Sequence, residues 1–402
     1  NITEIRFPEF SDAWKQRKFG DSFDFLQNNT LSRASLNDTS GCAKNVHYGD
    51  ILVKFGESIS AEKADLPFIC DREILKKLSK SILKNGDVVI ADTAEDMTTG
   101  KSCEIVDVDE CMPVLAGLHT IPVRPKQKFG KYYLGYYLNS EAFHSQLIPL
   151  IQGIKVYSIS KSSIKDTVVM FPDDVQEQEK IGSLFNRIDN TITLQQRKLN
   201  SLQKLKKGLL QKMFPKNGEN ITEIRFPEFS DAWKQRKFSE VFEEYSEKKH
   251  PELPALTIIQ GKGTILRDAS DRNLLYDKAN LTSYKLVRKD DFIVHLRTFE
   301  GGLEKANSDG IVSPAYHIFH GKNTDTRFFY PFFRSKYFID ALLKPHVYGI
   351  RDGKSIDIEG MKTISFLVPS FEEQNKIGKF VETLDNTITL QQRWLFYTHK
   401  QS

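Results

Sequence analysis

The sequence has few cysteines, no long apolar run and little net charge. Its four cysteines (Cys42, Cys70, Cys103 and Cys111) form no CxxC pair, so the pattern favours reduced thiols over a zinc site or a disulfide framework. No stretch approaches the roughly 18 consecutive apolar residues of a membrane span, and no apolar signal region opens the chain. We therefore expect a cytoplasmic protein. Because Asn1 stands in place of Met, we expect the natural N-terminus to be missing or processed. The net charge of +4 is only a weak indication of a polyanionic partner.

Catalytic and metal-binding signatures are also missing. The sequence contains no Asn-Pro-Pro-Tyr/Phe, the signature of adenine methylation. Residues 99–102 (TGKS) resemble the end of a phosphate-binding loop, but Glu95 stands where the first glycine belongs, so we expect a turn. We expect no catalytic residue and no metal site on this chain. The other candidates for metal or base chemistry, for which we expect structural roles, are Asp107, Asp109, Glu110, His119 and His317.

Two segments occur twice in the chain. Residues 1–19 (NITEIRFPEFSDAWKQRKF) return unchanged at 220–238, and residues 189–197 return unchanged at 385–393. Nineteen consecutive identities cannot arise by chance, so the chain is an internal duplication. The stretches between the repeated segments differ in length and have little obvious identity. The order is therefore arm, variable body and helix, followed by the same three parts again.

This order predicts an α+β fold with two related cores. We expect the two variable bodies to be similar α/β domains, separated by two long antiparallel coiled-coil helices and related by an internal pseudo-twofold axis. The predicted segments are a repeated N-terminal arm (1–19), a first body (20–172), a central helix (173–219), a second copy of the arm (220–238), a second body (239–369) and a C-terminal helix whose end is shortened or divergent (370–402).

Each body shows short β-like runs, an amphipathic helix and a glycine-containing loop. The two bodies follow the same order, so we expect one fold with diverged surfaces. The expected elements are strands at 50–53, 86–90 and 119–123, a helix at 132–148 and a loop at 152–159 in the first body, and a strand at 289–294, a helix at 331–343 and a loop at 349–356 in the second.

A capping residue followed three positions later by Glu opens each long helix, at Asp174 and Ser370. Apolar residues then recur at heptad spacing, which predicts a coiled-coil seam, and the simplest partner for each helix is the other copy. Both helices have glutamine at the same seam position. A buried polar pair there can fix register, whereas a solvated glutamine at the helix edge is the alternative. The predicted seam residues are Ile181, Phe185, Ile188, Ile192, Gln195, Leu199 and Leu202 in the first helix and Ile377, Val381, Leu384, Ile388 and Gln391 in the second.

The segment that leads into each long helix follows a fixed pattern. It consists of a proline, then Glu-Gln, Lys-Ile and Asp-Asn-x-Ile. The first copy contains Pro172, Glu177-Gln178, Lys180-Ile181 and Asp189–Ile192, and the second contains Pro369, Glu373-Gln374, Lys376-Ile377 and Asp385–Ile388. With the repeated arms and variable bodies, this pattern resembles the specificity subunit of type I restriction-modification enzymes. The resemblance covers nearly the whole chain, and its motifs are specific in combination.

The resemblance implies a non-catalytic DNA-binding subunit of a type I restriction enzyme and adenine-specific methyltransferase complex. Its two target-recognition domains would each read one half of a bipartite, asymmetric DNA target, with the paired helices as a ruler. Two methyltransferase subunits would dock on the repeated parts, and restriction subunits would join for cleavage. No cofactor is expected on this chain, because S-adenosylmethionine would bind the methyltransferase partner, and ATP and Mg would bind the restriction partner.

The arms contain aromatic residues among charged ones, and Pro8 interrupts any early helix. We expect an extended arm whose aromatic side chains dock on a neighbouring core. The identity of the two arms also fits contact with identical partners, and the two interpretations are compatible. The predicted methyltransferase-docking residues are Phe7, Phe10, Trp14, Phe226, Phe229 and Trp233.

The charge distribution permits local DNA contacts rather than a basic domain. Residues 239–369 contain 19 Lys and Arg against 18 Asp and Glu. Phosphate contacts need only local clusters, and arginine can pair with guanine while lysine neutralises phosphate. For each candidate, a solvated surface charge is the alternative. The predicted DNA-binding residues are Arg124, Lys126, Lys128, Lys155, Tyr157 and Lys161 in the first body and Lys262, Arg267, Arg297, Arg351 and Lys354 in the second.

Two other functions stay open on the sequence. The first is a non-catalytic coiled-coil adaptor that joins two ligand-binding domains without reading DNA sequence. The second is an independent nuclease, which is disfavoured because no metal-binding acidic constellation repeats in both bodies.

Overall fold

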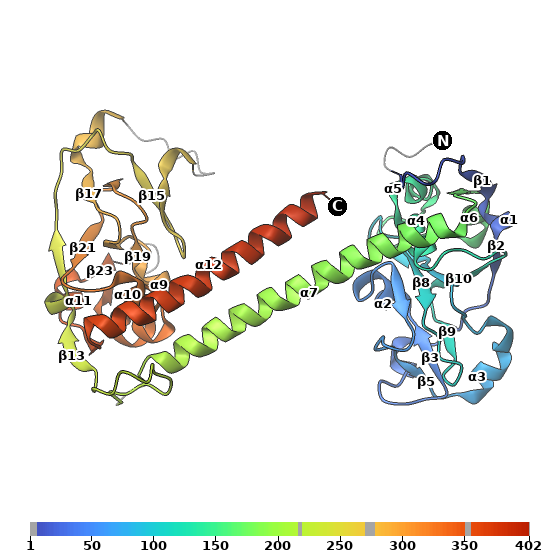
Figure 1. Ribbon diagram of the computed structural model, residues 1–402, viewed down its shortest axis with the longest axis horizontal. Coiled ribbons are helices and arrows are strands. Elements are labelled where there is room, and N and C mark those ends of the chain that lie inside the picture. The colour runs from blue at the N-terminus through green and yellow to red at the C-terminus, as the bar shows by residue number, and fades with distance from the viewer. Residues whose placement is uncertain (1–5, 216–218, 270–277, 350–354, 402) are drawn as a thin grey trace. The chain divides into compact units, whose positions relative to one another are not determined.

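The computed structural model of the protein describes residues 6–215, 219–269, 278–349 and 355–401. The chain divides into two compact units, which we call unit 1 (residues up to Thr193) and unit 2 (residues from Leu194 on). The boundary lies inside helix α7, Val175–Met213, so the first half of this helix belongs to unit 1 and the second half to unit 2 (Figure 1). Both units mix helices with sheets, which confirms the predicted α+β class.

Unit 1 is built on a five-stranded sheet in the order β2-β10-β6-β8-β4. All neighbours pair antiparallel except β4 and β8, which are parallel. A second sheet has the order β5-β3-β9, and two strand pairs, β1-β12 and β7-β11, complete the unit. The strands are β1 Lys15–Lys18, β2 Phe23–Phe25, β3 Ala43–Val46, β4 Ser58–Ser60, β5 Phe68–Ile69, β6 Val88–Ala91, β7 Thr93–Ala94, β8 Ser102–Val106, β9 Val114–Ala116, β10 Thr120–Pro125, β11 Tyr157–Ser158 and β12 Val168–Phe171.

Unit 2 repeats the centre of this plan with a four-stranded sheet in the order β14-β21-β18-β19. Strand β13, which belongs to the second arm, pairs antiparallel with β24, the exit strand that precedes the C-terminal helix. Strand β1 of the first arm pairs in the same way with β12, the exit strand before α7. The remaining strands form the pairs β15-β16, β17-β20 and β22-β23. The strands are β13 Lys234–Lys237, β14 Phe242–Tyr245, β15 Leu256–Ile259, β16 Gly263–Leu266, β17 Lys285–Val287, β18 Phe292–Val294, β19 Glu304–Lys305, β20 Gly310–Val312, β21 His317–Gly321, β22 Val347–Tyr348, β23 Ser355–Ile356 and β24 Ser365–Val368.

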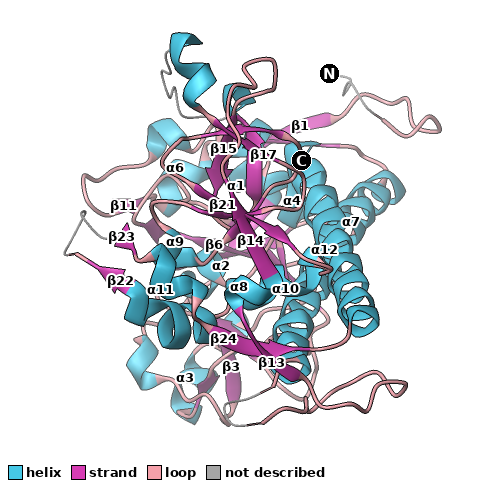
Figure 2. Cartoon of the chain, turned by 90° about the vertical axis from the view of Figure 1, so that its left-hand side faces the viewer, coloured by secondary structure: helices cyan, strands magenta, loops and turns pink. Residues whose placement is uncertain are grey.

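The helices of each unit pack against a phenylalanine-rich core. In unit 2 the core joins Phe238, Phe242 and Phe333, all under 3% exposed, with rings within 4.9–5.6 Å of one another. Figure 2 distinguishes the helices from the strands by colour. The other helices are α1 Phe19–Ser22, α2 Tyr48–Val53, α3 Arg72–Lys77, α4 Tyr133–Asn139, α5 Glu141–His144, α6 Lys161–Lys165, α8 Phe238–Val241, α9 Thr298–Gly301, α10 Thr326–Phe333, α11 Ile358–Lys362 and α12 Phe371–Gln401.

The prediction of a strand at residues 50–53 was wrong, because these residues lie in helix α2. The His47 ring caps this helix by accepting a hydrogen bond from the Gly49 N–H (3.2 Å), and Asp50 supplies negative charge in the first turn. Only Ile51 is buried, while Val53 is 89% exposed. Four consecutive residues of which three are apolar do not distinguish a short helix from a strand.

The two amphipathic helices of the bodies are each interrupted. The first was expected at 132–148, but Ser140 is extended between α4 and α5. The second was expected at 331–343, but α10 begins at Thr326 and ends at Phe333, and a separate π-helical turn follows at Phe338–Leu343. In unit 1 the side chain of Asn139 is bonded to the backbone of Ser102 on β8, a tertiary contact that the helical periodicity does not contain.

The long helices begin at the predicted caps. The Asp174 carboxylate accepts from the Gln176 N–H (2.8 Å), and the Ser370 hydroxyl accepts from the Glu373 N–H (3.3 Å). Within the described residues, none of the helices has the length and apolar content needed to cross a membrane.

Candidate functional site

The first arm is held on the start of α7 by a two-point ion pair. Arg6 Nε and Nη2 donate to the two carboxylate oxygens of Glu177 at 2.7 and 2.8 Å, and these side chains are only 9% and 1% exposed. Trp14 Nε1 donates to the same carboxylate at 3.3 Å. The pairing raises the pKa of Arg6, because the carboxylate stabilises the charged guanidinium. Glu177, predicted as a capping residue, therefore also anchors the arm.

The second arm makes the same contact in unit 2. Arg225 Nε and Nη2 donate to the two oxygens of Glu373, both at 2.7 Å, and Glu373 is 1% exposed. A lysine one turn further along each helix lies over an arm aromatic ring, as Lys376 does over Phe226 at 4.9 Å. The arginine–glutamate clamp is thus the same in both arms, while the tryptophan contact differs, because the buried Trp233 Nε1 has no hydrogen-bond partner.

The glutamine next to each of these glutamates ties the helix to its own body. Gln178 accepts from the Gly130 N–H (2.8 Å) and donates to the Pro172 carbonyl (2.7 Å). Gln374 accepts from the Asp325 N–H (3.1 Å) and donates to the Pro369 carbonyl (3.0 Å). The recurring Pro and Glu-Gln pattern is therefore a joint that fixes arm, body and helix together in each unit.

Most of the aromatic residues predicted to dock a methyltransferase contact helices of the unit to which their arm belongs, as expected for an arm that docks on a neighbouring core. Lys180 lies 5.8 Å from the Phe7 ring and 5.2 Å from the Phe10 ring. Trp233 is only 4% exposed, so its side chain is not accessible to a partner. The others keep part of their surface exposed; they are Phe7, Phe10, Trp14, Phe226 and Phe229.

The two long helices pack antiparallel within unit 2. Gln391 Nε2 donates to Gln195 Oε1 at 2.6 Å, and Lys206 forms an ion pair with Asp385, so the partner number falls as the α7 number rises (Figure 1). The two seam glutamines therefore bond to one another rather than to solvent. Leu199, Ile377, Val381 and Ile388 are buried at 8% exposure or less, and Leu202 and Leu384 are partly buried, as is Ile192 at the end of unit 1.

The seam residues in the first half of α7 lie in unit 1 and have a different environment. Phe185 is 46% exposed and lies 5.4 Å from the Tyr136 ring, while Ile188 is 41% exposed and Ile181 packs on the core of the unit. The Tyr136 hydroxyl donates to Asp189 at 2.6 Å. Burial and this carboxylate raise the pKa of Tyr136.

Three of the predicted DNA-binding residues surround one hairpin of unit 1. Gln152 and Ser158 exchange two backbone hydrogen bonds of 2.9 and 2.8 Å, and Lys155 is exposed at the tip between them. Tyr157 lies on β11, and Lys161 is the first residue of α6. Gly153 has a φ of +135°, and a Cβ there would lie 1.9 Å from the Val156 carbonyl, so only glycine permits this turn. The loop therefore presents Lys155 from a constrained backbone.

The other three candidates of unit 1 are not equivalent to one another. Arg124 is engaged inside the unit, because its Nε and Nη2 donate to Asp87 at 2.9 and 2.6 Å, and Asp87 is 2% exposed. This pairing raises the pKa of Arg124. Lys126 bonds to the Gly20 carbonyl (3.0 Å) and remains exposed, as does Lys128. Lys126 and Lys128 can therefore reach a phosphate, whereas the Arg124 guanidinium is held in the protein.

In unit 2 the candidates lie apart. Lys262 is exposed in the turn between β15 and β16, and Arg297 is exposed just before α9. Arg267 is partly buried, with its Nη1 donating to the Tyr284 hydroxyl at 3.1 Å. Arg351 and Lys354 lie outside the described residues. The β22-β23 pair that flanks them corresponds to the hairpin of unit 1, since Gln152 and Tyr348 each face the equivalent serine.

Sequence reasoning missed the buried carboxylates that shape both units. Glu104, 2% exposed, accepts from the backbone N–H of Tyr132 (2.8 Å) and Gly135 (3.1 Å), and burial raises its pKa to about 7. Asp291, 0% exposed, accepts from His320 Nδ1 (2.7 Å) and from the Arg288 N–H (2.8 Å). The Asp-Asp sequence before β18 was the available signal for Asp291, because an acidic residue next to a buried strand needs partners.

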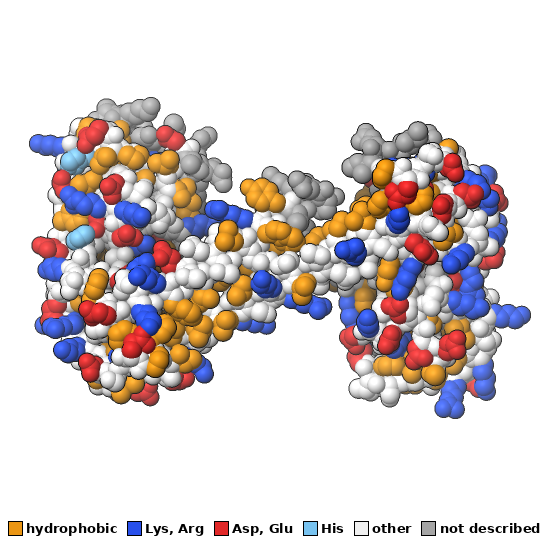
Figure 3. Space-filling view, viewed as in Figure 1, with side chains coloured by type: hydrophobic (Ala, Val, Ile, Leu, Met, Phe, Trp, Pro, Cys, Tyr) orange, Lys and Arg blue, Asp and Glu red, His pale blue; other side chains and the backbone are white. Residues whose placement is uncertain are grey.

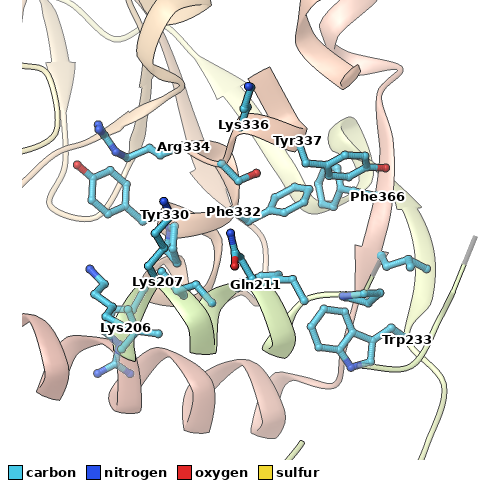
Figure 4. Close-up of a pocket in the computed structure, with 18 of the residues that line it drawn as sticks. Lys206, Lys207, Gln211, Trp233, Tyr330, Phe332, Arg334, Lys336, Tyr337 and Phe366 are labelled. Atoms are coloured by element: carbon cyan, nitrogen blue, oxygen red, sulfur yellow. The ribbon is translucent and has the colours of Figure 1, made fainter. Parts of the chain in front are cut away.

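A cleft of about 1800 Å³ lies within unit 2. Figure 4 shows Lys207 and Gln211 of α7 on one side, Arg334 and Lys336 on the other, and aromatic rings at the wall. Arg334 is paired with the buried Glu304, whereas Lys207 and Lys336 are exposed. Over the described part of the chain, no group of three or more His, Cys, Asp or Glu side chains is placed to hold a metal ion.

Comparison with known proteins agrees with this architecture. Residues 11–204 match the family described as type I restriction modification DNA specificity domain. A protein of Methanocaldococcus jannaschii named as a putative type I restriction enzyme specificity subunit (MjaX) is 21% identical over 98% of this chain and 92% of that protein. The crystal structure of a type I restriction-modification S subunit from M. genitalium aligns with a TM-score of 0.55 at 13% identity, covering 98% of this chain and 95% of that one.

The duplicated arm, body and helix, with the arginine–glutamate clamp in both copies, agree with this class of DNA specificity protein. The resemblance drawn from the repeated motifs is confirmed. Residues 11–204 match the DNA specificity domain of type I restriction-modification systems, and over nearly its whole length the chain is similar to a putative type I specificity subunit.

Proposed function

We propose that this chain reads a bipartite, asymmetric DNA sequence, with one unit on each half-site, as the non-catalytic subunit of a cytoplasmic restriction-modification complex. The observation that supports this most is the contrast between framework and surface. The Arg6–Glu177 and Arg225–Glu373 clamps are the same in both units, while the bodies that they hold differ in the size of the main sheet and in their smaller sheets. A shared frame with different surfaces suits a protein that must read two different sequences in one assembly.

The exposed basic residues fit backbone contact combined with local readout. Lys155, held at the tip of a constrained hairpin, is the strongest candidate in unit 1, and Lys126, Lys128 and Lys161 add positive charge that can neutralise phosphates. In unit 2 we propose Lys262 and Arg297, both exposed, together with Arg351 and Lys354, which lie outside the described residues. Figure 3 shows Lys and Arg mixed with Asp and Glu over both units, which suits local contacts rather than a basic stripe.

We further propose that two methyltransferase subunits dock on the repeated arms and long helices, and that restriction subunits join them. Identical arms offer identical contacts to two copies of one partner. We propose that the partner contacts the accessible parts of Phe7, Phe10, Phe226 and Phe229. Trp233 is buried inside unit 2 and does not contact the partner directly. S-adenosylmethionine would be bound by the methyltransferase subunits, and ATP and Mg by the restriction subunits.

The decisive experiment is methylome sequencing of cells that carry this gene with its methyltransferase partner, against cells with the partner alone. We expect a split, asymmetric N6-methyladenine motif only when the gene is present. Lys155→Ala should lower methylation at the site, whereas Lys63→Ala, which changes an exposed lysine elsewhere in unit 1, should leave it unchanged. A confirmed complex that produces no motif would contradict the proposal.

A further inference from the structure

Two of the four cysteines lie opposite one another at one end of the smaller sheet of unit 1. Strand β3 pairs antiparallel with β5, and the last paired residues at this end are Ala43 and Ile69. Continued by one residue, the register sets Cys42 opposite Cys70. The Cys42 N–H donates to the Ile69 carbonyl at 2.8 Å, so the two segments are still in contact at this step.

This backbone hydrogen bond limits the distance between the two cysteines. The Cys42 Cα is one bond away from the donating nitrogen, and the Cys70 Cα belongs to the same peptide unit as the accepting oxygen of Ile69. With standard bond lengths, the two cysteine Cα atoms therefore lie within about 7 Å of one another. A disulfide needs Cα atoms no more than about 7 Å apart, so the pair meets the distance requirement for a bridge.

The two thiols also lie on the same face of the sheet. Ala43 and Ile69 are 0% exposed and occupy the buried face. Because side chains alternate along a strand, their neighbours Cys42 and Cys70 lie on the opposite face, where the first is half-buried and the second is exposed. Cys42 Sγ donates to the Ile69 carbonyl at 3.2 Å, and Cys70 Sγ donates to the Ser40 carbonyl at 3.6 Å. Each thiol is thus held against the backbone that leads to the other cysteine.

The other two cysteines have different environments. Cys103 is 0% exposed on β8, its Sγ donates to the Gly56 carbonyl at 2.9 Å, and burial raises the pKa of its thiol to about 12. Cys111 is exposed in the connection between β8 and β9. The first is therefore unreactive, and the second serves as an exposed thiol for comparison with the opposed pair.

We propose that Cys42 and Cys70 are a redox-sensitive site that forms a reversible disulfide when the folded chain meets a low-molecular-weight disulfide. One cysteine thiolate attacks the reagent, forms a mixed disulfide and releases one thiol. The other cysteine thiolate then attacks the sulfur of the first cysteine and releases the second thiol. The protein loses two protons and two electrons, and the reagent disulfide is reduced to two thiols.

The bridge needs little change in the fold, because backbone hydrogen bonds already hold the two segments together in the reduced chain. It closes the loop from residue 42 to residue 70, which contains β3, α2, β4 and β5. The site is thus compatible with a chain whose cysteines are reduced at rest, since intracellular disulfides generally act as transient sensors rather than as a framework.

The test is oxidation of the folded full chain with excess oxidised glutathione at pH 8, followed by alkylation, non-reducing digestion and mass spectrometry. We expect a Cys42–Cys70 cross-linked peptide pair as the main product, with Cys111 carrying glutathione alone. Cys111→Ser should leave the cross-link unchanged. Cys70→Ser should abolish it and leave glutathione on Cys42, because the second thiol that displaces glutathione is gone.

Oxidation in concentrated guanidinium chloride shows whether the fold directs the pairing. In an unfolded chain loop closure favours the nearest cysteines, so Cys103–Cys111, eight residues apart, should exceed Cys42–Cys70, 28 residues apart, by about sixfold. The same product distribution in the folded and unfolded chains would overturn the inference. Glutathione that persists on both Cys42 and Cys70 of the folded chain, or a main cross-link from either one to Cys111, would overturn it as well. None of these outcomes depends on DNA recognition, so the proposed function would stand.

Discussion

Arg6 and Glu177, 171 residues apart in sequence, are joined by two hydrogen bonds of 2.7 and 2.8 Å, and both side chains are almost inaccessible to solvent. Arg225 and Glu373 repeat this pair in unit 2. The arm is therefore part of each unit's fold. The strand of each arm, β1 or β13, also pairs with the strand that precedes the long helix, β12 or β24. The start and the end of each unit's chain are therefore held together.

Replacing Arg225 with Met should destabilise unit 2 by about 3 kcal/mol, because the carboxylate of Glu373 would stay buried without a cation. The matched control is Arg236→Met. Arg236 lies 3.7 Å from Glu240, and these side chains are 54% and 47% exposed, so the loss should be below about 1 kcal/mol. Hydrogen exchange of the first-turn amides of α12 would measure both values. Equal effects of the two substitutions would show that the clamp adds nothing beyond a surface pair.

The Gln195–Gln391 hydrogen bond should behave as a coupled pair. Gln195→Leu alone should destabilise the helix pair by about 1 kcal/mol, because it leaves the Gln391 amide partly buried without its partner. The double change to Leu should recover this loss and add apolar contact, at the expense of register specificity. Urea unfolding of both single variants and the double variant would give the coupling energy, and simple additivity would favour the solvated-glutamine alternative.

The stability of unit 1 should depend on pH through Glu104. Burial raises its pKa to about 7 from a usual value of 4.5, so the folded state binds a proton that the unfolded state releases between these values. The group therefore favours folding most below pH 4.5, and this advantage is lost as pH rises through 7, with a difference on the order of 3 kcal/mol. Glu104→Gln should remove this slope. Hydrogen exchange at β8 and α4 between pH 5 and 8 measures it, and an unchanged slope in the variant would assign the effect to another group.

The two units pair equivalent buried aspartates with different cationic or hydrogen-bonding partners. Asp87 and Asp291 each accept from the backbone N–H three residues earlier, at 2.8 Å, but the first is paired with Arg124 and the second with His320. A guanidinium can donate two parallel hydrogen bonds to one carboxylate, whereas an imidazole ring nitrogen donates one. We expect His320→Arg to stabilise unit 2 by about 1 kcal/mol. Thermal unfolding of the variant tests this, and a melting temperature at or below that of the wild type would contradict it.

Much of this arrangement could be predicted from the sequence. The repeat established the order of parts, and the heptad pattern identified both long helices and the two glutamines that meet, because these features depend on spacing within one segment. The local environment of a charged side chain depends on segments far apart in the chain. Arg124 reads as a free arginine in sequence, yet Asp87 holds it, and only the sheet register brings them together. For the same reason, the pattern of residues 50–53 could not reveal that His47 caps a helix there.

The hairpin of unit 1 offers the most direct link between backbone geometry and DNA recognition. Gly153→Ala should open the turn, because a Cβ would lie 1.9 Å from the Val156 carbonyl oxygen at a φ of +135°. We expect lost protection of the Ser158 amide, which donates to the Gln152 carbonyl at 2.8 Å, and on the order of tenfold weaker DNA binding by the assembled complex as Lys155 loses its position.

Gly208→Ala is the matched control for this substitution. Gly208 lies inside α7 with no atom within 4 Å of an added Cβ, so the change should stabilise the helix by about 0.5–1 kcal/mol and leave DNA binding intact. Hydrogen exchange reports the hairpin, and a DNA titration reports recognition. If Gly153→Ala unprotects Ser158 while DNA affinity and the methylated sequence stay unchanged, the hairpin is not a reading element, and Lys155 must be removed from the proposed DNA contacts.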